Sequence, residues 1–155
     1  MTISKIGSDK IALKAKKNSM LIQKCHDYGG EWDPVDKEWI FSDIVSDKIA
    51  ELDAIYDSPL VAVEITAKRE LNSRPAIEFL GCEIARAWGR DSGAKLAHDV
   101  AKISGTVRSA GSMKNWVVEI QPQATFRLKV PERLLDLHDE TKDWEIRKLD
   151  NGGVK

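Results

Sequence analysis

Two short loops rich in glycine and serine carry the residues that are best suited to bind an anion. They are GRDSGAK, residues 89–95, and RSAGSMKNW, residues 108–116. Small residues allow backbone N–H groups to converge on a phosphate, and arginine and lysine side chains add charge-assisted hydrogen bonds. Neither loop has the spacing of a P-loop or a dinucleotide fingerprint, so a tight connection between strands is the alternative. The candidate phosphate-binding residues here are Arg90, Ser92, Lys95, Arg108, Ser112, Lys114 and Asn115, and Trp116 is available to stack on a base.

Catalytic chemistry has less support from the spacing of the residues. Asp91 and Ser92 precede His98 and would offer a nucleophile and a base, but no third group is placed to orient that base. Glu78 and Glu83 would give a carboxylate pair, although isolated glutamates on a strand or helix are usually solvated. The sequence therefore predicts a protein that is not an enzyme and needs no cofactor.

Metal binding is not expected either. A structural zinc site needs about four ligands at short paired spacings. Here only Cys25 and His26 are adjacent, while His98 and His138 stand alone. Neither Cys25 nor Cys82 lies in a CxxC motif, so we expect both to be free thiols in a reducing compartment.

Size and composition are those of a soluble globular protein. The chain has 155 residues, of which 42% are hydrophobic and 32% are charged, enough for one domain or two very small ones. No apolar run approaches the roughly 20 residues of a membrane span, and the N-terminus lacks the apolar core of a signal peptide. We therefore expect a cytoplasmic protein without a membrane partner. These features do not specify its oligomeric state.

A second aromatic candidate is the stretch GGEWDPVDKEWIFSD, residues 29–43. Its turn signal, Asp33 to Asp36, separates two tryptophans and predicts a β-hairpin. Trp39 is expected to pack beneath helices, whereas Trp32 either closes the turn or stacks on a nucleobase, as aromatic residues of single-strand binders do. In the second case the nucleic-acid-binding residues of this part are Lys14, Lys16, Lys17, Trp32 and Lys37.

The same hairpin resembles the small domain that lies beside the motor of annealing helicases, the HepA-related-protein domain. In that family an aromatic–turn–lysine–tryptophan–x–phenylalanine hairpin lies between two helices, and the domain contacts DNA at forks. Because 155 residues contain nothing of a helicase motor, the resemblance implies an isolated binding module. The whole chain also looks like accessory proteins of plasmids and phages. The similarity covers residues 18–55 and places at the motif positions Trp32, Asp33, Lys37, Trp39 and Phe41.

The elements expected around this hairpin form a β-α-β-β-α unit over residues 1–58. KIALKAK alternates as a half-buried strand does, and Asn18 or Ser19 can cap the helix that follows. After the hairpin, Ser42 is expected to cap a second helix, which ends before Pro59. We expect two helices on one face of a three-stranded sheet.

A second, β-rich subdomain is expected over residues 60–150, as a small barrel or a bent antiparallel sheet. Strands alternate in LVAVEITAK, TVR, NWVVEI and TFRLKVP, a short helix follows Pro131, and DWEIRKL reads as a last strand. Residues 76–88 fit either a helix whose stripe ends at Trp88 or a hairpin bent at Gly81-Cys82, and we prefer the hairpin. Residues 94–104 carry the same ambiguity. Residues 151–155 are expected to be a tail, and the fold class is α+β.

Charge is distributed unevenly along the chain, whose net charge is −1. Residues 1–60 carry 8 lysines, no arginine and 11 acidic residues, for a net charge of −3. Residues 61–135 have a net charge of +4 and contain all the arginines except Arg147. Since the planar fork of arginine suits phosphates, the middle segment is the better candidate for an anionic partner.

Three functions are compatible with these patterns. The leading hypothesis is a non-catalytic accessory protein of a mobile element that binds nucleic acid: single-stranded or forked DNA, or RNA. The alternative is a small anti-defence inhibitor, similar to an anti-CRISPR protein. Its acidic N-terminal part would occupy the surface with which a nucleic-acid-handling protein complex of the host binds nucleic acid. The third is a nucleotide-binding enzyme that uses the two Gly/Ser loops.

Overall fold

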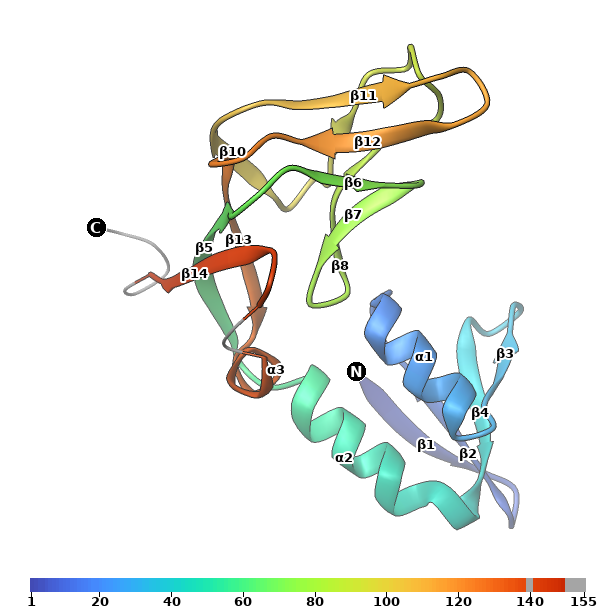
Figure 1. Cartoon of the computed structure of the whole chain (residues 1–155). Helices are drawn as coiled ribbons and strands as arrows, with labels where there is room; N and C mark the ends of the chain where they lie inside the picture. The colour runs from blue at the N-terminus through green and yellow to red at the C-terminus, as the bar shows by residue number, and fades with distance from the viewer. Residues whose placement is uncertain (139–140, 150–155) are drawn as a thin grey trace.

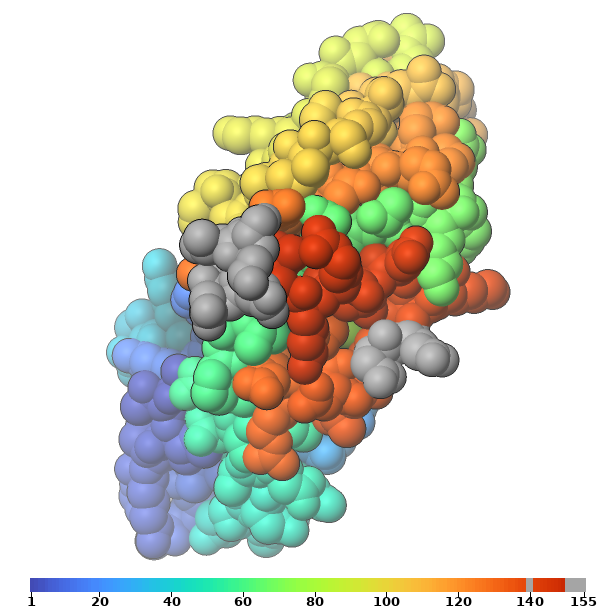
Figure 2. Space-filling model, turned by 90° about the vertical axis from the view of Figure 1, so that its left-hand side faces the viewer, coloured from blue at the N-terminus to red at the C-terminus, as the bar shows by residue number. Residues whose placement is uncertain are grey.

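The computed structural model describes residues 1–138 and 141–149 as a mixed α+β protein built from antiparallel sheets (Figure 1). The expected fold class is therefore confirmed. The expected tail, residues 151–155, lies outside the described residues. Figure 2 shows an elongated molecule, with the N-terminal elements at one end and strands of the β-rich part at the other. Of the helices in the described ranges, none combines the length and the apolar character that a membrane-spanning helix needs.

The N-terminal group of elements contains one strand more than expected. Its sheet has the order β1-β2-β4-β3, and every pair is antiparallel. The extra strand is β1, which pairs with β2 along its whole length. All five residues of β1 are exposed, so neither face of this strand is buried. Its sequence TISKI accordingly lacks the strict apolar–polar alternation that marks a half-buried strand. The elements are β1 Thr2–Ile6, β2 Lys10–Lys14, α1 Ser19–Asp27, β3 Glu31–Asp33, β4 Glu38–Ser42, a 3₁₀ turn Asp43–Val45 and α2 Ser46–Tyr56.

Both helices of this group pack on the same face of the sheet. Ile11 of β2 lies opposite Phe41 of β4, so both side chains lie on one face, and both are buried. Phe41 packs beneath the helices, and Trp39, which was expected to pack there, lies half-buried at the edge of the same cluster. The buried residues of this cluster are Ile11, Leu13, Leu21, Cys25, Phe41, Ile49 and Leu52.

The β-rich part consists of three small antiparallel sheets around one core. Their strand orders are β10-β13-β5-β14, β11-β12-β6 and β7-β8-β9. The two ambiguous segments, 76–88 and 94–104, both form strands, so the preferred hairpin is confirmed. Its two-residue turn, Leu80 and Gly81, has φ values of 50° and 79°, as tight hairpins require. The elements are β5 Leu60–Ala67, β6 Leu71–Ser73, β7 Ala76–Phe79, β8 Cys82–Arg86, β9 Lys95–Leu96, β10 Ala101–Ser104, β11 Val107–Gly111, β12 Trp116–Ile120, β13 Thr125–Pro131, α3 Glu132–Leu137 and β14 Trp144–Lys148.

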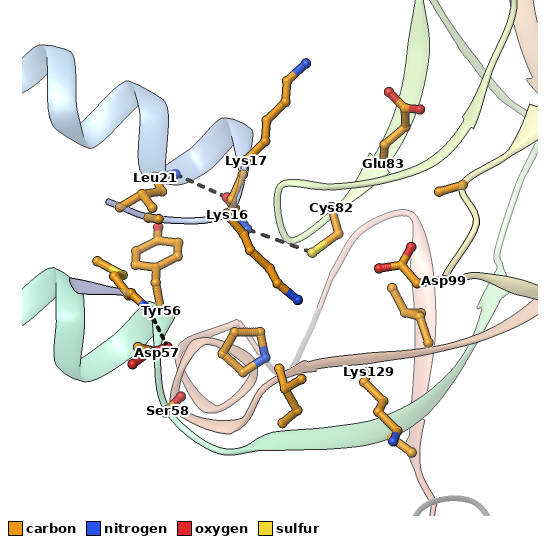
Figure 3. A pocket seen from close by; sticks show the side chains of 18 of the residues that line it. Lys16, Lys17, Leu21, Tyr56, Asp57, Ser58, Cys82, Glu83, Asp99 and Lys129 are labelled. Atoms are coloured by element: carbon orange, nitrogen blue, oxygen red, sulfur yellow. Dashed lines mark hydrogen bonds and ion pairs between the residues drawn. The ribbon is translucent and has the colours of Figure 1, made fainter. Parts of the chain in front are cut away.

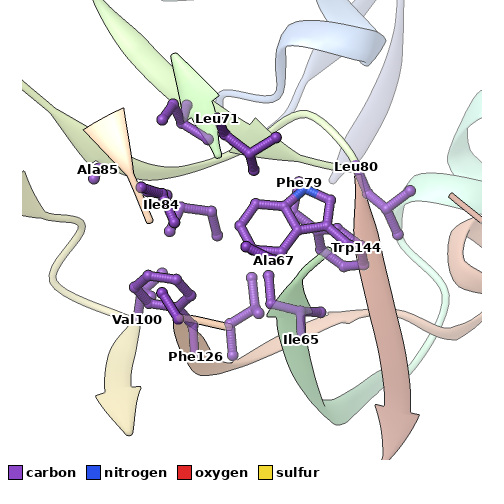
Figure 4. Packing of buried hydrophobic residues seen from close by; sticks show 14 of the residues in the cluster. Ile65, Ala67, Leu71, Phe79, Leu80, Ile84, Ala85, Val100, Phe126 and Trp144 are labelled. Atoms are coloured by element: carbon purple, nitrogen blue, oxygen red, sulfur yellow. The ribbon is translucent and has the colours of Figure 1, made fainter. Parts of the chain in front are cut away.

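Three aromatic rings, those of Phe79, Phe126 and Trp144, pack together in this core (Figure 4). Trp144 meets Phe79 and Phe126 edge-on, with ring centroids 6.1 Å and 6.0 Å apart. Such T-shaped pairs add to the free energy gained by burying the rings. Because Trp144 comes from the last strand and Phe79 from the β7–β8 hairpin, the core ties distant parts of the chain together.

Asn18 joins the two groups of elements. As expected for a helix cap, its Oδ1 accepts the N–H groups of Met20 and Leu21 at 2.9 Å and 3.1 Å. Its Nδ2 donates to the carbonyl oxygen of Leu80 at 3.0 Å. The N–H of Ser19 donates to the carbonyl oxygen of Gly81 at 3.1 Å. The start of α1 is thereby fixed on the β7–β8 turn.

The outer face of β5 carries a bridged ion-pair network. Glu64 accepts hydrogen bonds from Arg147 of β14 at 2.8 Å and from Arg127 of β13 at 3.0 Å. These hydrogen bonds lower the pKa of Glu64, with that from Arg147 contributing most. Because the folded protein favours the ionised form, the network stabilises the fold above the ordinary pKa and loses this effect as pH falls through the lowered value.

We therefore expect Glu64→Gln to lower Tm by about 2–4 °C at neutral pH, the size of a networked surface pair. The gap to wild type should close at acidic pH, where wild-type Glu64 becomes protonated. Thermal unfolding followed by circular dichroism across pH measures both quantities. Glu145→Gln is the control, because this β14 residue pairs with no cation among the described residues. A gap that is equally large at low pH would contradict the role of ionised Glu64.

Candidate nucleic-acid interface

The structure brings the two Gly/Ser loops together. Ser109 of β11 donates from Oγ to the carbonyl oxygen of Arg90 at 2.7 Å, and the same Oγ accepts the N–H of Gly93 at 2.9 Å. Residues 89–94 therefore lie against the hairpin formed by β11 and β12. Figure 1 shows this hairpin at the end of the molecule away from α1 and α2.

Trp88 is the most exposed tryptophan among the described residues, with 61% of its surface accessible. It stands between β8 and the first loop. Its backbone N–H donates to Oγ of Ser92 at 3.0 Å, and this Oγ in turn donates to the carbonyl oxygen of Gly89. The backbone beneath the indole is thus held in place. Sequence analysis did not select Trp88, although a tryptophan just before a Gly/Ser loop is a signal that could have found it.

The ring of Trp116 is partly covered, because the guanidinium group of Arg74 lies over one of its faces. The guanidinium carbon of Arg74 lies 4.4 Å from the ring centroid, and Nη1 donates to the carbonyl oxygen of Lys114 at 3.1 Å. Arg74 is nevertheless an exposed residue, and a cation–π contact uses only one face of the guanidinium plane. A base can stack on an arginine plane as well as on an aromatic ring. Sequence analysis missed Arg74, which lies 40 residues from Lys114 along the chain.

The chain segments that carry Trp88 and Arg74 lie side by side. The N–H of Ala87 donates to the carbonyl oxygen of Pro75 at 3.1 Å, so the residues next to Trp88 and Arg74 are paired. We call this region the Trp88–Trp116 surface. It comprises Arg74, Trp88, Arg90, Lys95, Lys114 and Trp116.

The cations of this region differ in how far they are neutralised. Arg90 forms an ion pair with Asp91 at 3.0 Å, and the hydrogen bonds between them raise the pKa of Arg90 and lower that of Asp91. Lys95 and Lys114 pair with no carboxylate among residues 1–138 and 141–149. These lysines and Arg74 therefore supply the positive charge that is not already paired.

Arg108 lies apart from this surface. It is next to Ser109 on β11, and neighbouring residues of a strand point to opposite faces. Arg108 instead binds Glu119 across the hairpin at 2.6 Å. The structure therefore does not bring Arg108 together with Trp116, because alternation along β11 separates them.

Three of the backbone N–H groups that the loops offered to an anion are already in use. The N–H of Ser92 donates to Gly89, that of Gly93 to Ser109, and that of Asn115 to Oγ of Ser112 at 3.0 Å. Ser92, Ser112 and Asn115 thus hold the loops in shape. With these three N–H groups occupied, a phosphate would depend largely on side chains for its contacts.

The tryptophan hairpin forms a second, separate aromatic site. Trp32 is 50% exposed and packs on Trp39 with ring centroids 5.6 Å apart, while His26 meets Trp39 edge-on at 5.0 Å. Lys37 lies in the β3–β4 turn with φ of 54°. In the same turn the carboxylates of Asp33, Asp36 and Glu38 lie within 4.8 Å of one another, so the surroundings are acidic.

The lysines expected beside Trp32 are distributed elsewhere. Leu13, Trp39 and Trp32 lie opposite one another across the sheet and share a face. Lys14 follows Leu13 and therefore points to the other face. Lys16 and Lys17 lie between β2 and α1, where they line a cleft between the two groups of elements. The structure therefore separates these three lysines from Trp32.

Comparisons with known proteins add no relative: no family model, no curated protein and no solved structure matches this chain. The similarity of residues 18–55 to the HepA-related-protein domain thus stays a prediction.

Proposed function

We propose that this protein binds single-stranded nucleic acid without catalysis, through the Trp88–Trp116 surface. The observation that carries the proposal is an exposed indole, Trp88, on a chain segment that pairs with the segment of Arg74, whose guanidinium lies over the ring of a second tryptophan, Trp116. Stacking on an aromatic side chain contributes about 1–3 kcal/mol per base in single-strand binders, whatever the base. Lys95 and Lys114 are the free cations that would hold the backbone phosphates.

Unpaired bases fit this surface better than a duplex does. It is formed by loops and a hairpin end, and it offers no helix for insertion into a major groove. Exposed tryptophan and arginine planes need bases whose faces are accessible, as they are in single strands and at forks. DNA and RNA both meet this requirement.

The wider proposal is that of a two-part cytoplasmic accessory protein of a mobile element, with subdomains at 1–58 and 60–150. The separate hydrophobic clusters of the two parts support this division. The similarity of the first part to the HepA-related-protein domain is consistent with a binding role, although its acidic turn restricts where phosphates could approach.

The proposal predicts binding that weakens steeply with salt. We expect a fluorescent oligothymidylate of about 20 nucleotides to bind at about 50 mM salt, with a slope of log K against log salt of about −0.7 per phosphate contacted. Lys95→Gln and Lys114→Gln should each reduce that slope by about 0.7. Fluorescence anisotropy measures it. Lys48→Gln is the control, because Lys48 is an exposed lysine on α2. Slopes unchanged in both lysine variants would place the phosphates elsewhere.

A second candidate function, an inhibitor of a nucleic-acid-handling protein complex, has one observation in its favour. Met113, in the turn of the β11–β12 hairpin, is 70% exposed and Trp88 is 61% exposed, and protein interfaces are enriched in methionine and tryptophan. Absence of oligonucleotide binding at low salt, together with binding of a defined protein complex that Trp88→Ala abolishes, would favour this function over the first.

A further inference from the structure

A large cleft separates the N-terminal elements from the β-rich part (Figure 3). Its volume is about 1090 Å³, and its walls come from the segment before α1, the end of α2, β5, β8 and β13. Small-molecule sites typically have volumes of about 300–1,000 Å³ and favour interfaces between domains. The cleft is therefore large enough for a ligand of that kind.

Lys16 and Lys129, both on the walls of this cleft, have no acidic partner within residues 1–138 and 141–149. Figure 3 shows Lys16 extending into the cleft from the segment before α1, Lys129 on the wall formed by β13 with its ammonium group directed away from Lys16, and Lys17 directed away from the cleft. No carboxylate of the described residues forms an ion pair with Lys16 or Lys129. Asp99 is the acid of the cleft that likewise lacks a cation within pairing distance. Unpaired positive charge thus exceeds unpaired negative charge.

Apart from Lys17, which is directed away, and Asp99, the other charges of the lining are matched within the described residues. Arg86 binds Glu83 at 2.7 Å, Arg127 binds Glu64 at 3.0 Å, and the N-terminal ammonium binds Asp57 at 3.2 Å. These pairs leave Lys16 and Lys129 as the groups that a ligand anion would neutralise. Because the two lysines come from different groups of elements, such an anion would also link those groups.

The remainder of the lining is largely apolar. It includes the ring of Tyr56 at the end of α2 and aliphatic side chains from both groups of elements. Such a surface favours a ligand with an aromatic or aliphatic part. The apolar lining residues used in this argument are Leu21, Leu60, Leu128 and Pro131.

We propose that this cleft is a binding site for a small organic anion with an apolar part, whose phosphate, sulfonate or carboxylate group contacts Lys16, with the positive charge of Lys129 on the opposite wall adding to the attraction. The site is independent of the Trp88–Trp116 surface, so it stands or falls separately from nucleic-acid binding. The anion supplies the negative charge that these lysines do not find among the described residues, and its apolar part packs against the wall formed by Tyr56.

The first test uses the fluorescent anion 1-anilinonaphthalene-8-sulfonate. We expect saturable binding with a blue-shifted, enhanced emission, and at least roughly tenfold weaker binding in the double variant Lys16→Gln/Lys129→Gln, since hydrogen bonds to charged groups are among the strongest. Lys48→Gln should bind as wild type does. The uncharged N-phenyl-1-naphthylamine should be insensitive to the double variant. No enhancement, or equal affinity in wild type and double variant, would overturn the proposal.

The second test locates the bound anion by cysteine protection. Cys82 lines the cleft and is partly accessible, whereas Cys25 is fully buried. Burial, followed by the charges of Asp99 and Glu78, raises the pKa of the Cys82 thiol, so alkylation by iodoacetamide should be slow enough to follow by mass spectrometry. Saturating anilinonaphthalene sulfonate should slow alkylation of Cys82, and an unchanged rate would contradict binding in the cleft.

Competition distinguishes the possible sources of the anion. Displacement of the dye by adenosine monophosphate would assign the site to organic phosphates, and displacement by decanoate would assign it to carboxylate amphiphiles. Displacement by neither would contradict the proposed anion specificity.

Discussion

Gly81→Ala is expected to lower the free energy of unfolding by about 3 kcal/mol, which corresponds to a fall in Tm of about 6–12 °C for a chain of this size. Two costs combine at this position. Gly81 has φ of 79°, which is unfavourable for a residue with a Cβ atom. A Cβ there would also overlap the side-chain amide of Asn18, whose Cγ would be only 2.6 Å away. Thermal and denaturant unfolding measure the change.

The second cost arises because Asn18 has no alternative position that keeps its bonds. Its amide simultaneously caps α1, through Met20 and Leu21, and binds the carbonyl oxygen of Leu80. Displacing it removes the cap, a loss of about 0.5–2 kcal/mol, and weakens the contact between the two groups of elements. The effect should therefore exceed that of a strained backbone alone.

Gly29→Ala is the matched control. Gly29 has φ of 76°, but a Cβ there would meet no atom within 4 Å. Its substitution should cost only the conformational term, about 1–2 kcal/mol. In an Asn18→Ala background, Gly81→Ala should likewise fall to this smaller cost, because the amide it would overlap is gone. Equal costs for Gly81→Ala and Gly29→Ala in the wild-type background would show that the Asn18 contact contributes nothing.

Trp88→Ala is expected to weaken binding of an oligothymidylate by about 5–150-fold, equivalent to the 1–3 kcal/mol of one stacked base. The indole is 61% exposed, so its removal should leave the midpoint of thermal unfolding nearly unchanged. Loss of affinity without loss of stability would identify Trp88 as a contact residue. Fluorescence anisotropy at a fixed low salt concentration gives the affinity.

Trp32→Ala is the control for that experiment, because Trp32 is a similarly exposed tryptophan at 50%. It lies in the acidic hairpin, away from the unpaired cations Lys95 and Lys114. We expect its substitution to change the affinity less than twofold. Loss of affinity in Trp32→Ala with full binding by Trp88→Ala would reverse the assignment and favour the hairpin.

Local patterns predicted much of the fold because most strands here bury one face. The alternation of LVAVEITAK predicted β5, and the turn at Asp33–Asp36 predicted the β3–β4 hairpin. The strand β1 was missed because all five of its residues are exposed, so no burial pattern marks it. Residues 76–88 were ambiguous because their apolar spacing fits both a helix and a hairpin, and only Leu80 and Gly81, with positive φ, decide between them.

The candidate site was less predictable because it depends on contacts between distant residues. The loops at 89–95 and 108–116 were selected from their composition, but their proximity depends on Ser109. Arg74 was missed because its position over Trp116 follows from the pairing of β6 with β12, which no local pattern encodes. Arg108 was selected for its charge. Side chains alternate between the two faces of β11, however, and Arg108 lies on the same face as Glu119, to which it binds.

Photo-crosslinking tests the central claim most directly. An oligothymidylate containing 5-iodouracil reacts on irradiation with aromatic side chains that stack on the substituted base, and mass spectrometry identifies the modified peptide. The account predicts crosslinks in peptides that contain Trp88 or Trp116, lost at high salt. Crosslinks confined to Trp32 or Trp39, or none under conditions where the oligonucleotide is bound, would contradict it.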